Sequence, residues 1–219
     1  MKKLAGIVVL LTLGTIVSSQ VMAGDWKSYR VTITNATSHQ VITPPLIVVH
    51  NSKFNLFNVT AAASEGLATQ AETGDNSVLY NEVNGANGVY DVVAASGPVV
   101  YGHSVTYDIR APKKAKISVT GMLATSNDAF AAISGKSLPK KSVSYMASTY
   151  DAGSEANNEN CAYIPGPPCS AESGNLRATE GAEGFITIHS GIKGGRDLNP
   201  AQLDWRGATA IVTIDRVYN

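Results

Sequence analysis

The sequence predicts an all-β protein, an antiparallel β-sandwich of two sheets with about eight strands and one short crossover helix. Three observations lead to this class. Short segments rich in β-branched residues alternate apolar and polar side chains, as half-buried strands do. Turn-forming pairs such as Asn84-Gly85 and Gly97-Pro98 separate these segments at short intervals. Helix-forming composition is confined to one stretch, whereas a parallel α/β sheet would need a helix between each pair of strands.

The first expected strand is residues 29–35, where apolar and polar side chains alternate. Residues 46–49 form another apolar, β-branched segment. Pro44 and Pro45 come directly before it, and proline cannot donate a ladder hydrogen bond, so we expect an edge strand or a bend there. Two further segments are candidates for short strands, residues 40–42 and 53–59.

Residues 61–71 are rich in alanine, contain Ser64 as a candidate N-cap and precede Gly74, so they predict the crossover helix. The last expected strand, residues 208–217, is long and strongly β-branched, and we expect it to lie centrally. The other expected strands are residues 78–80, 89–93, 104–110, 116–123 and 184–189.

The first 23 residues have the features of a secretory signal peptide. Lys2 and Lys3 precede an apolar run, residues 4–17, which is shorter than the roughly 20 residues of a membrane-spanning helix. We expect cleavage after Ala23, which delivers the protein to the periplasm or the extracellular space. Residues 24–219 then form one domain.

Cys161 and Cys169 are the only cysteines, and in an exported chain we expect them to form a local disulfide. The closed loop is short, so its entropic effect should lie below the roughly 3 kcal/mol expected for a loop of about 15 residues. A metal–thiolate or redox pair is the alternative. The spacing is not Cys-x-x-Cys, however, and no second cysteine pair exists to complete a zinc site.

Two acidic stretches form a candidate cation site, residues 126–130 and residues 150–155. Each places carboxylates beside small turn-forming residues and next to apolar segments, as loops that present oxygen ligands to a hard cation do. Neither stretch contains cysteine or histidine, which disfavours zinc and copper. The alternative is that Asp128 and Asp151 cap their own turns and that Glu155 is a solvated charge.

Charge composition argues against a nucleic-acid-binding protein, and the lack of a nucleophile motif argues against a hydrolase. The chain has 17 basic and 17 acidic residues, and loss of Lys2 and Lys3 leaves the mature protein slightly acidic, so we expect no nucleic-acid partner. His189 would need Asp204 and a serine nearby to act in a hydrolase, but no Gly-x-Ser-x-Gly motif is present. We therefore expect a protein that is not an enzyme.

A series of short motifs extends over almost the whole expected domain, from residue 29 to residue 217. The segments are residues 29–35, 50–56, 63–68, 122–130, 150–155, 164–167 and 204–206. In their order and spacing they resemble the spondin domain. The chain is similar to the short, single-domain bacterial members of that family, which are secreted across an inner membrane.

The resemblance implies a β-sandwich similar to the C2 domain, with one calcium ion bound by loops at one end through three acidic ligands. By motif these ligands are Asp128, Asp151 and Glu155. The last departs from the animal pattern, which has Asp there, but Glu carries the same charge on a longer arm. Gly153 would allow the sharp turn that brings the second and third carboxylates onto one ion.

Asn127, Asn157, backbone carbonyls and water could complete the six to eight oxygens that calcium prefers. We therefore expect a secreted, non-enzymatic, calcium-binding β-sandwich that mediates cell-surface or matrix adhesion through an extracellular protein or a glycan. One alternative is a metal-free structural domain of the periplasm or envelope. Another is a C2-like, calcium-dependent membrane binder with Phe130 as its apolar contact, although membrane binding is not favoured.

Overall fold

The computed structural model describes residues 26–169 and 176–218 of the 219-residue chain, and it confirms a mostly β fold with few helices. The expected signal peptide, residues 1–23, lies outside the described residues. The strands are β1 Lys27–Asn35, β2 Leu46–His50, β3 Val89–Ala94, β4 Ser104–Ala111, β5 Lys116–Met122, β6 Ala129–Ser137, β7 Ser142–Asp151, β8 Thr187–Ile188 and β9 Ala210–Val217. The helices are α1 Glu65–Thr73, α2 Ser77–Val83, α3 Pro200–Leu203 and the 3₁₀ helix η1 Cys161–Tyr163.

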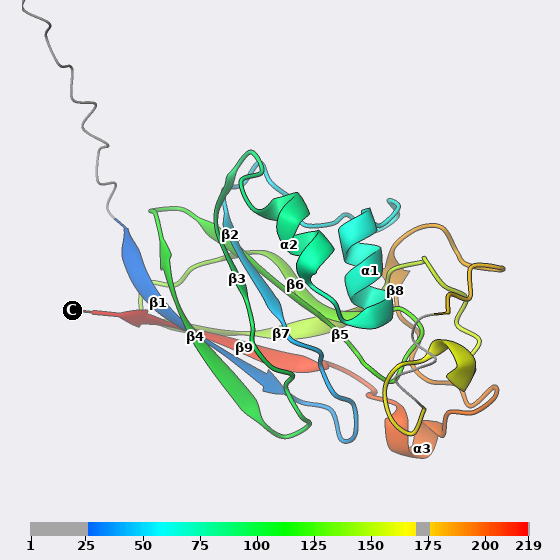
Figure 1. The fold of residues 1–219 in the computed structure, drawn as a ribbon. Helices are drawn as coiled ribbons and strands as arrows, with labels where there is room; N and C mark the ends of the chain where they lie inside the picture. The colour runs from blue at the N-terminus through cyan, green and yellow to red at the C-terminus, as the bar shows by residue number, and fades with distance from the viewer. Residues whose placement is uncertain (1–25, 170–175, 219) are drawn as a thin grey trace, which may run out of the picture.

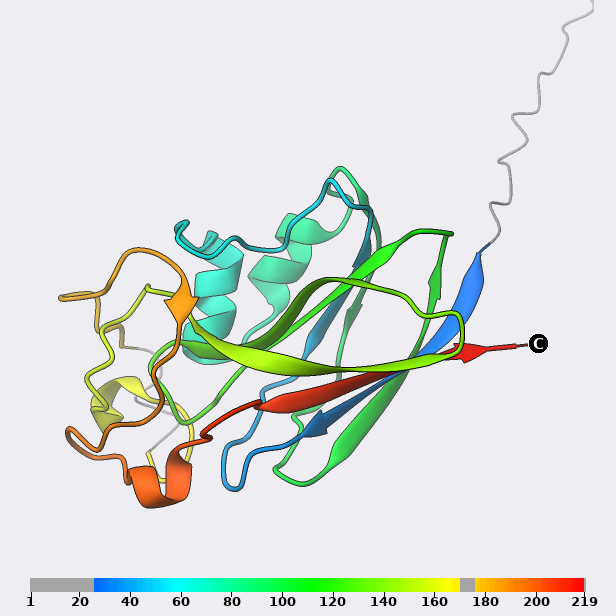
Figure 2. The same ribbon diagram turned by 180° about the vertical axis from the view of Figure 1, so that it is seen from behind.

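All nine strands in the described part of the chain pair antiparallel within one continuous, nearly closed sheet (Figures 1 and 2). Its order is β3-β2-β5-β6-β7-β9-β1-β4, and β8 adds to β7. The ten-residue β7 links the two halves of the sheet, since residues 142–147 pair with β9 and residues 148–151 pair with β6. Val93 of β3 and Val105 of β4 pack on the same central core, so the two outer strands approach each other.

The central core lies inside the curled sheet and is built from the alternation that the sequence shows. In β1, Val31 and Ile33 are buried, and the intervening Thr32 faces outward and hydrogen-bonds to Thr106 of β4 at 3.1 Å between their hydroxyl oxygens. β9 lies between β1 and β7, as expected for a central strand, and buries Val212 and Ile214.

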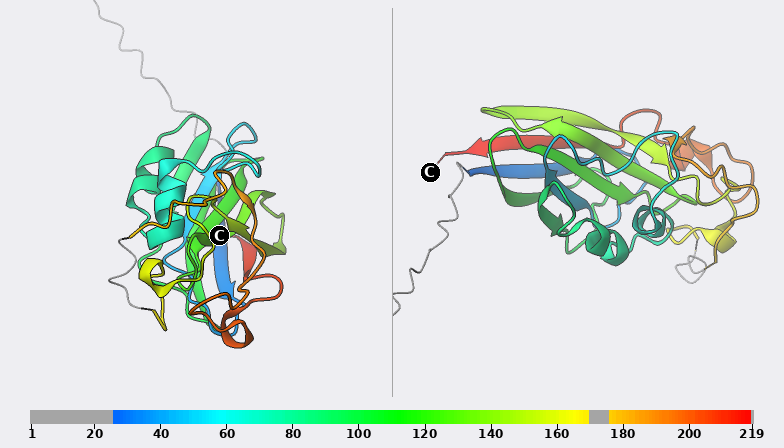
Figure 3. Two further views of the ribbon diagram at one scale, coloured as in Figure 1. Left: turned by 90° about the vertical axis from the view of Figure 1, so that its right-hand side faces the viewer. Right: turned by 90° about the horizontal axis from the view of Figure 1, so that it is seen from above.

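Helices α1 and α2 cover the outer face of the half formed by β2, β5 and β6, as the view from above shows (Figure 3). This second layer explains why β2 is buried on both faces. Ile47 and Val49 enter the central core, whereas Leu46 and Val48 pack under the helices. The prediction of an edge strand at residues 46–49 is wrong, because β2 lies between β3 and β5.

The predicted helix is confirmed, including its cap. The Ser64 hydroxyl accepts a hydrogen bond from the Leu67 amide at 3.2 Å, and Gly74 ends α1 in the left-handed conformation. Gly66 lets α2 approach closely, because a Cβ at this position would lie 2.5 Å from the Leu79 Cα.

Several strand predictions are wrong. Residues 78–80 belong to α2, where Leu79 and Val83, spaced by four, bury one helical face. Residues 53–59 form no strand, and at residues 40–42 only Ile42 makes isolated bridges. Of the predicted strand at residues 184–189, only residues 187–188 form a strand, β8. β6 and β7 were not predicted, because their serines, alanines and threonines weaken the apolar alternation.

The register separates two ends of the sheet. β1 begins and β9 ends at one end, where Ser28 pairs with Val217. β6 begins and β7 ends at the other end, where Ala129 pairs with Asp151. The loops within residues 152–169 and 176–209 gather at this second end, away from the C-terminus (Figure 3). Within the described residues, we find no helix with the length and apolarity needed to span a membrane.

Candidate metal site

Strand pairing places two of the predicted ligands side by side. Asp128 directly precedes β6, Asp151 is the last residue of β7, and Ala129 pairs with Asp151. The Ala152 amide also donates to the Asp128 carbonyl at 3.1 Å. Both carboxylates therefore lie at the same end of the sheet, and both are buried.

The Asp128 side chain holds the turn that carries the third predicted ligand. Its Oδ2 accepts hydrogen bonds from the Ser154 amide at 2.8 Å and from the Glu155 amide at 3.0 Å, with the Ser154 hydroxyl at 3.3 Å. Its Oδ1 is buried and has no hydrogen-bond partner in the structure. One oxygen thus orders the turn, and the other is left with an unused acceptor capacity.

Glu155 has the same division of roles. Its Oε1 accepts a hydrogen bond from the Ala178 amide at 2.7 Å, whereas its Oε2 is buried and unpartnered. The side chain is only 1% exposed, so the expectation of a solvated charge is wrong. Glu72 of α1 lies close enough to act on it electrostatically and forms an ion pair with Arg177 at 2.5 Å.

Asp151 is more fully engaged than the other two carboxylates. Its Oδ1 accepts from the Gly153 amide at 2.7 Å, and its Oδ2 accepts from the Asn157 side-chain amide. The Asn157 carbonyl oxygen in turn lies 2.9 Å from the His189 Nε2. Each carboxylate oxygen has two lone pairs, so these bonds leave Asp151 with further acceptor capacity.

The electrostatics of the three carboxylates reflect burial and mutual repulsion. Burial, together with the neighbouring charge of Asp151, raises the pKa of Asp128 to about 7. Burial raises the pKa of Glu155 to about 8, with further contributions from Glu72 and Asp128. Burial also raises the pKa of Asp151, whereas hydrogen bonds from Asn157 and Gly153 act to lower it. Near neutral pH, this group of buried acids favours binding of either protons or a cation.

The chemistry of these residues fits a hard cation. Two buried carboxylate oxygens lack hydrogen-bond partners, and all of the candidate ligand atoms are oxygens. The geometry is not that of a closed site. Across residues 26–169 and 176–218, no three His, Cys, Asp or Glu side chains are grouped closely enough to hold a metal ion. Binding of a cation by all three carboxylates would therefore require them to move closer together.

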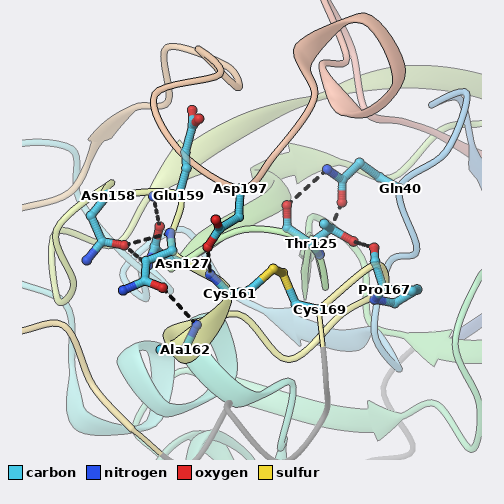
Figure 4. The surroundings of a disulfide bond; sticks show 11 residues. Gln40, Thr125, Asn127, Asn158, Glu159, Cys161, Ala162, Pro167, Cys169 and Asp197 are labelled. Carbon is cyan, nitrogen blue, oxygen red and sulfur yellow. Dashed lines mark hydrogen bonds between the residues drawn. A yellow bond between two sulfur atoms is a disulfide. The ribbon is translucent and has the colours of Figure 1, made fainter.

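The two asparagines proposed as extra ligands are engaged elsewhere. The Asn127 carbonyl oxygen accepts from the Glu159 amide at 3.2 Å, and its amide group donates to Asn158 at 3.3 Å (Figure 4). Asn157 uses its carbonyl oxygen toward His189 and its amide toward Asp151. Both residues connect the loops around the carboxylates, and each of their carbonyl oxygens already has one hydrogen-bond partner.

Gly153 makes the turn between the second and third carboxylates possible, as the sequence predicts. Its φ is +67°, in the left-handed region that favours glycine. A Cβ here would lie 2.3 Å from the Phe185 carbonyl oxygen. The turn therefore needs glycine both for its backbone conformation and for its contact with the segment that leads into β8.

The predicted disulfide between Cys161 and Cys169 is confirmed, with a Cα–Cα distance of 5.0 Å. It closes the loop of residues 161–169, and Figure 4 shows the surroundings of this disulfide. The loop is anchored at both ends, since the Cys161 amide donates to Asp197 at 2.8 Å and the Thr125 hydroxyl donates to the Pro167 carbonyl at 2.8 Å. It thus ties the chain after Glu155 back to the segment that precedes Asp128.

His189 does not form the arrangement that a hydrolase needs. Its Nδ1 accepts from the Gly191 amide at 3.0 Å, so its Nε2 carries the proton and donates to Asn157. Asp204 instead accepts from the Ile192 amide and from Arg206. Burial lowers the pKa of His189 to about 4, so the ring is neutral near pH 7.

Sequence reasoning missed Glu159 as an organising residue of this end. Its carboxylate accepts hydrogen bonds from the Lys193 amide at 2.5 Å and from the Gly195 amide at 2.7 Å. Its backbone adopts a φ of +53°, which is uncommon for a residue with a side chain. The residue lies in a polar stretch with no period, so no signal in the sequence distinguished it from a solvated glutamate.

No protein-family model matches this chain, and a search of curated proteins gives no match.

Proposed function

We propose that this protein is a secreted, non-enzymatic, calcium-binding β-sandwich that acts in adhesion at the cell surface or in a matrix. One observation carries the metal proposal: Asp128 and Glu155 each bury a carboxylate oxygen that has no hydrogen-bond partner. Leaving such an oxygen unpaired costs free energy, and a bound cation would remove that cost. Asp151 would be the third ligand, because each of its oxygens accepts one hydrogen bond and keeps a second lone pair.

The finer description of the fold and family is part of the same proposal. A two-sheet sandwich similar to the C2 domain would divide the continuous sheet at β7, with β9, β1 and β4 on one side. The resemblance to the spondin domain stays a prediction that rests on the sequence motifs. Secretion is supported by the leader-like N-terminus in the sequence and by the disulfide.

Calcium titration followed by thermal unfolding tests the metal site. We expect millimolar calcium to raise the melting temperature of the native protein, since a ligand that binds only the folded state stabilises it. The Asp128→Asn and Asp151→Asn variants should lose this rise. Magnesium serves as the control ion, because it needs a smaller and more rigid octahedral site than calcium does.

A matched control replaces Asp197, a carboxylate at the same end that accepts a hydrogen bond from the Cys161 amide. The Asp197→Asn variant removes the same charge and should keep the calcium response. Absence of any calcium-dependent rise in the native protein at millimolar calcium would contradict the proposed site.

A metal-free structural domain of the envelope is the second candidate. The raised pKa values of Asp128, about 7, and Glu155, about 8, favour it, because protons alone could neutralise these groups. Calorimetric titration with calcium distinguishes the two candidates. A proton-neutralised site gives no saturable heat at neutral pH, whereas a calcium site does.

The C2-like membrane binder is less well supported. Phe130 was its apolar candidate, but this ring is fully buried and stacks at 5.5 Å on Tyr150. Leu176, Phe185 and Ile188, which are 58%, 43% and 61% exposed, are among the apolar side chains that this end offers instead. Sedimentation with liposomes, with and without calcium, tests this alternative.

A further inference from the structure

A basic hollow lies at the end of the sheet opposite the three carboxylates. It has a volume of about 380 Å³. Five of its lining side chains are cationic, and none of the described lining residues is acidic; the cations are Lys27, Lys113, Lys114, Lys140 and Arg216. The volume lies within the range of about 300–1,000 Å³ that is usual for small-molecule sites.

The strand register brings these cations together from four parts of the chain, the first being Lys27 at the start of β1. Lys113 and Lys114 lie in the turn between β4 and β5. Lys140 lies in the connection between β6 and β7, and Arg216 lies near the end of β9. Ser142 of β7 pairs with Asp215 of β9, which places the last two elements side by side.

Arg216 is held in place before any ligand arrives. Its guanidinium lies 5.1 Å from the ring centre of Tyr29 and 5.5 Å from that of Tyr218, and its Nη1 donates to the Ser28 carbonyl at 2.7 Å. The Tyr218 hydroxyl also donates to the Lys140 carbonyl at 2.5 Å. The floor of the hollow is therefore preorganised, which lowers the entropic cost of binding.

The three lysines that project from the turns carry uncompensated charge. Lys113, Lys114 and Lys140 are exposed and make no ion pair with any described residue. The chain as a whole has equal numbers of basic and acidic residues, and Asp128, Asp151 and their neighbours lie at the far end. Neutral overall charge thus conceals a concentration of positive charge at this hollow.

We propose that this basic hollow binds a phosphate ester. Several cations around one hollow match a ligand with more than one negative charge, and a phosphate monoester carries close to two near neutral pH. The volume also leaves room for an organic group beside the phosphate, with the exposed Tyr218 ring as a wall. The source is either a soluble phosphorylated compound or the headgroup of a lipid.

Binding is measured by calorimetry in calcium-free buffer, so the outcome does not depend on the proposed metal site. The two probes are inorganic pyrophosphate, and phosphatidylcholine vesicles with and without phosphatidic acid. The test variant is Lys113→Gln with Lys140→Gln. The matched control is Lys53→Gln with Arg196→Gln, which removes the same charge from side chains that do not line the hollow.

We expect at least one probe to bind the native protein, with affinity about tenfold or more weaker in the test variant and nearly unchanged in the control. Pyrophosphate binding identifies a soluble ligand, and binding only to vesicles with phosphatidic acid identifies a headgroup. Amide chemical shifts of the native protein give a second readout, which should move at Lys114 and Arg216. Absence of binding to both probes, or equal weakening in both variants, overturns the proposal.

Discussion

A carboxylate that is buried with one oxygen unpaired raises the free energy of the folded protein unless a proton or a cation occupies that oxygen. Glu155 is the clearest case, since its pKa is raised to about 8 and its Oε2 lacks a partner. The folded state therefore binds a proton more tightly at this group than the unfolded state does. Stability from this source is present at low pH and is lost as pH rises through the folded pKa.

The Glu155→Gln variant tests this in calcium-free buffer. Because glutamine cannot ionise, the variant should gain stability relative to the native protein as pH rises from about 4.5 to about 8, and the gain should then level off. We expect a final difference of about 1–3 kcal/mol, the usual cost of an unsatisfied buried polar group. Urea unfolding at several pH values measures it, and a difference that does not change with pH would contradict the assignment.

At the scale of single residues, the sequence was informative about which residue types meet and uninformative about their hydrogen bonds. The motif containing Asp128 and the motif containing Glu155 do come together, with the Glu155 amide donating to Asp128. The roles of Asn127 and Asn157 as connectors of loops could not be predicted. An asparagine can donate or accept, and only the folded loops decide which partner it meets.

At the scale of elements, the turn after β7 determines the position of Glu155. Asp151 and Asp128 accept three amide hydrogen bonds from this turn, from Gly153, Ser154 and Glu155. Gly153 also contacts the backbone of Phe185 closely, so the turn is packed between the end of β7 and the segment before β8. A change in this short turn should therefore affect both the stability and the candidate metal site.

Gly153→Ala should be strongly destabilising, because its Cβ would lie 2.3 Å from a backbone oxygen that cannot easily move. We expect a loss of about 2–4 kcal/mol in the free energy of unfolding. Gly181→Ala is the matched control. It also has positive φ, but the nearest atom to its Cβ would lie 3.8 Å away, so only the backbone cost of about 1 kcal/mol applies. Equal losses in the two variants would contradict this account.

The elements that were predicted correctly have strong local signals. α1 has a capping serine and an ending glycine, and β1 and β9 alternate clearly. Part of α2, residues 78–80, was predicted as a strand. Three apolar residues in a row do not distinguish the periodicity of a helix from that of a strand. The helix forms because Glu82 accepts from the Gly66 amide at 2.6 Å and from the Ser64 hydroxyl at 2.7 Å, contacts that arise only when α1 and α2 pack.

At the scale of the whole molecule, a sheet that is continuous through β7 should unfold as one unit. The central core receives side chains from both halves, so neither half keeps its apolar surface covered without the other. The sequence predicted the class and the approximate number of strands. It could not predict that one strand would serve both halves, because strand order depends on contacts between segments far apart in the chain.

Two tryptophans at opposite ends can test this cooperativity. Trp26 lies beside Tyr90 near the start of β1, and Trp205 lies beside His189 near the carboxylates. We expect the fluorescence of Trp205 in the Trp26→Phe variant to give the same urea midpoint as far-UV circular dichroism of that variant. The Trp205→Phe variant provides the converse measurement. Distinct midpoints within one variant would show that the two ends unfold separately.

The pairing of β1 with β9 has a mechanical consequence. These strands are antiparallel neighbours, and the start of one lies beside the end of the other, with Ser28 opposite Val217. A pulling force applied between these two positions would break the hydrogen bonds between β1 and β9 one after another. A force applied between one of them and the far end of the sheet would load many of these hydrogen bonds at the same time, in shear. The molecule should therefore resist tension far better along its length than between Ser28 and Val217.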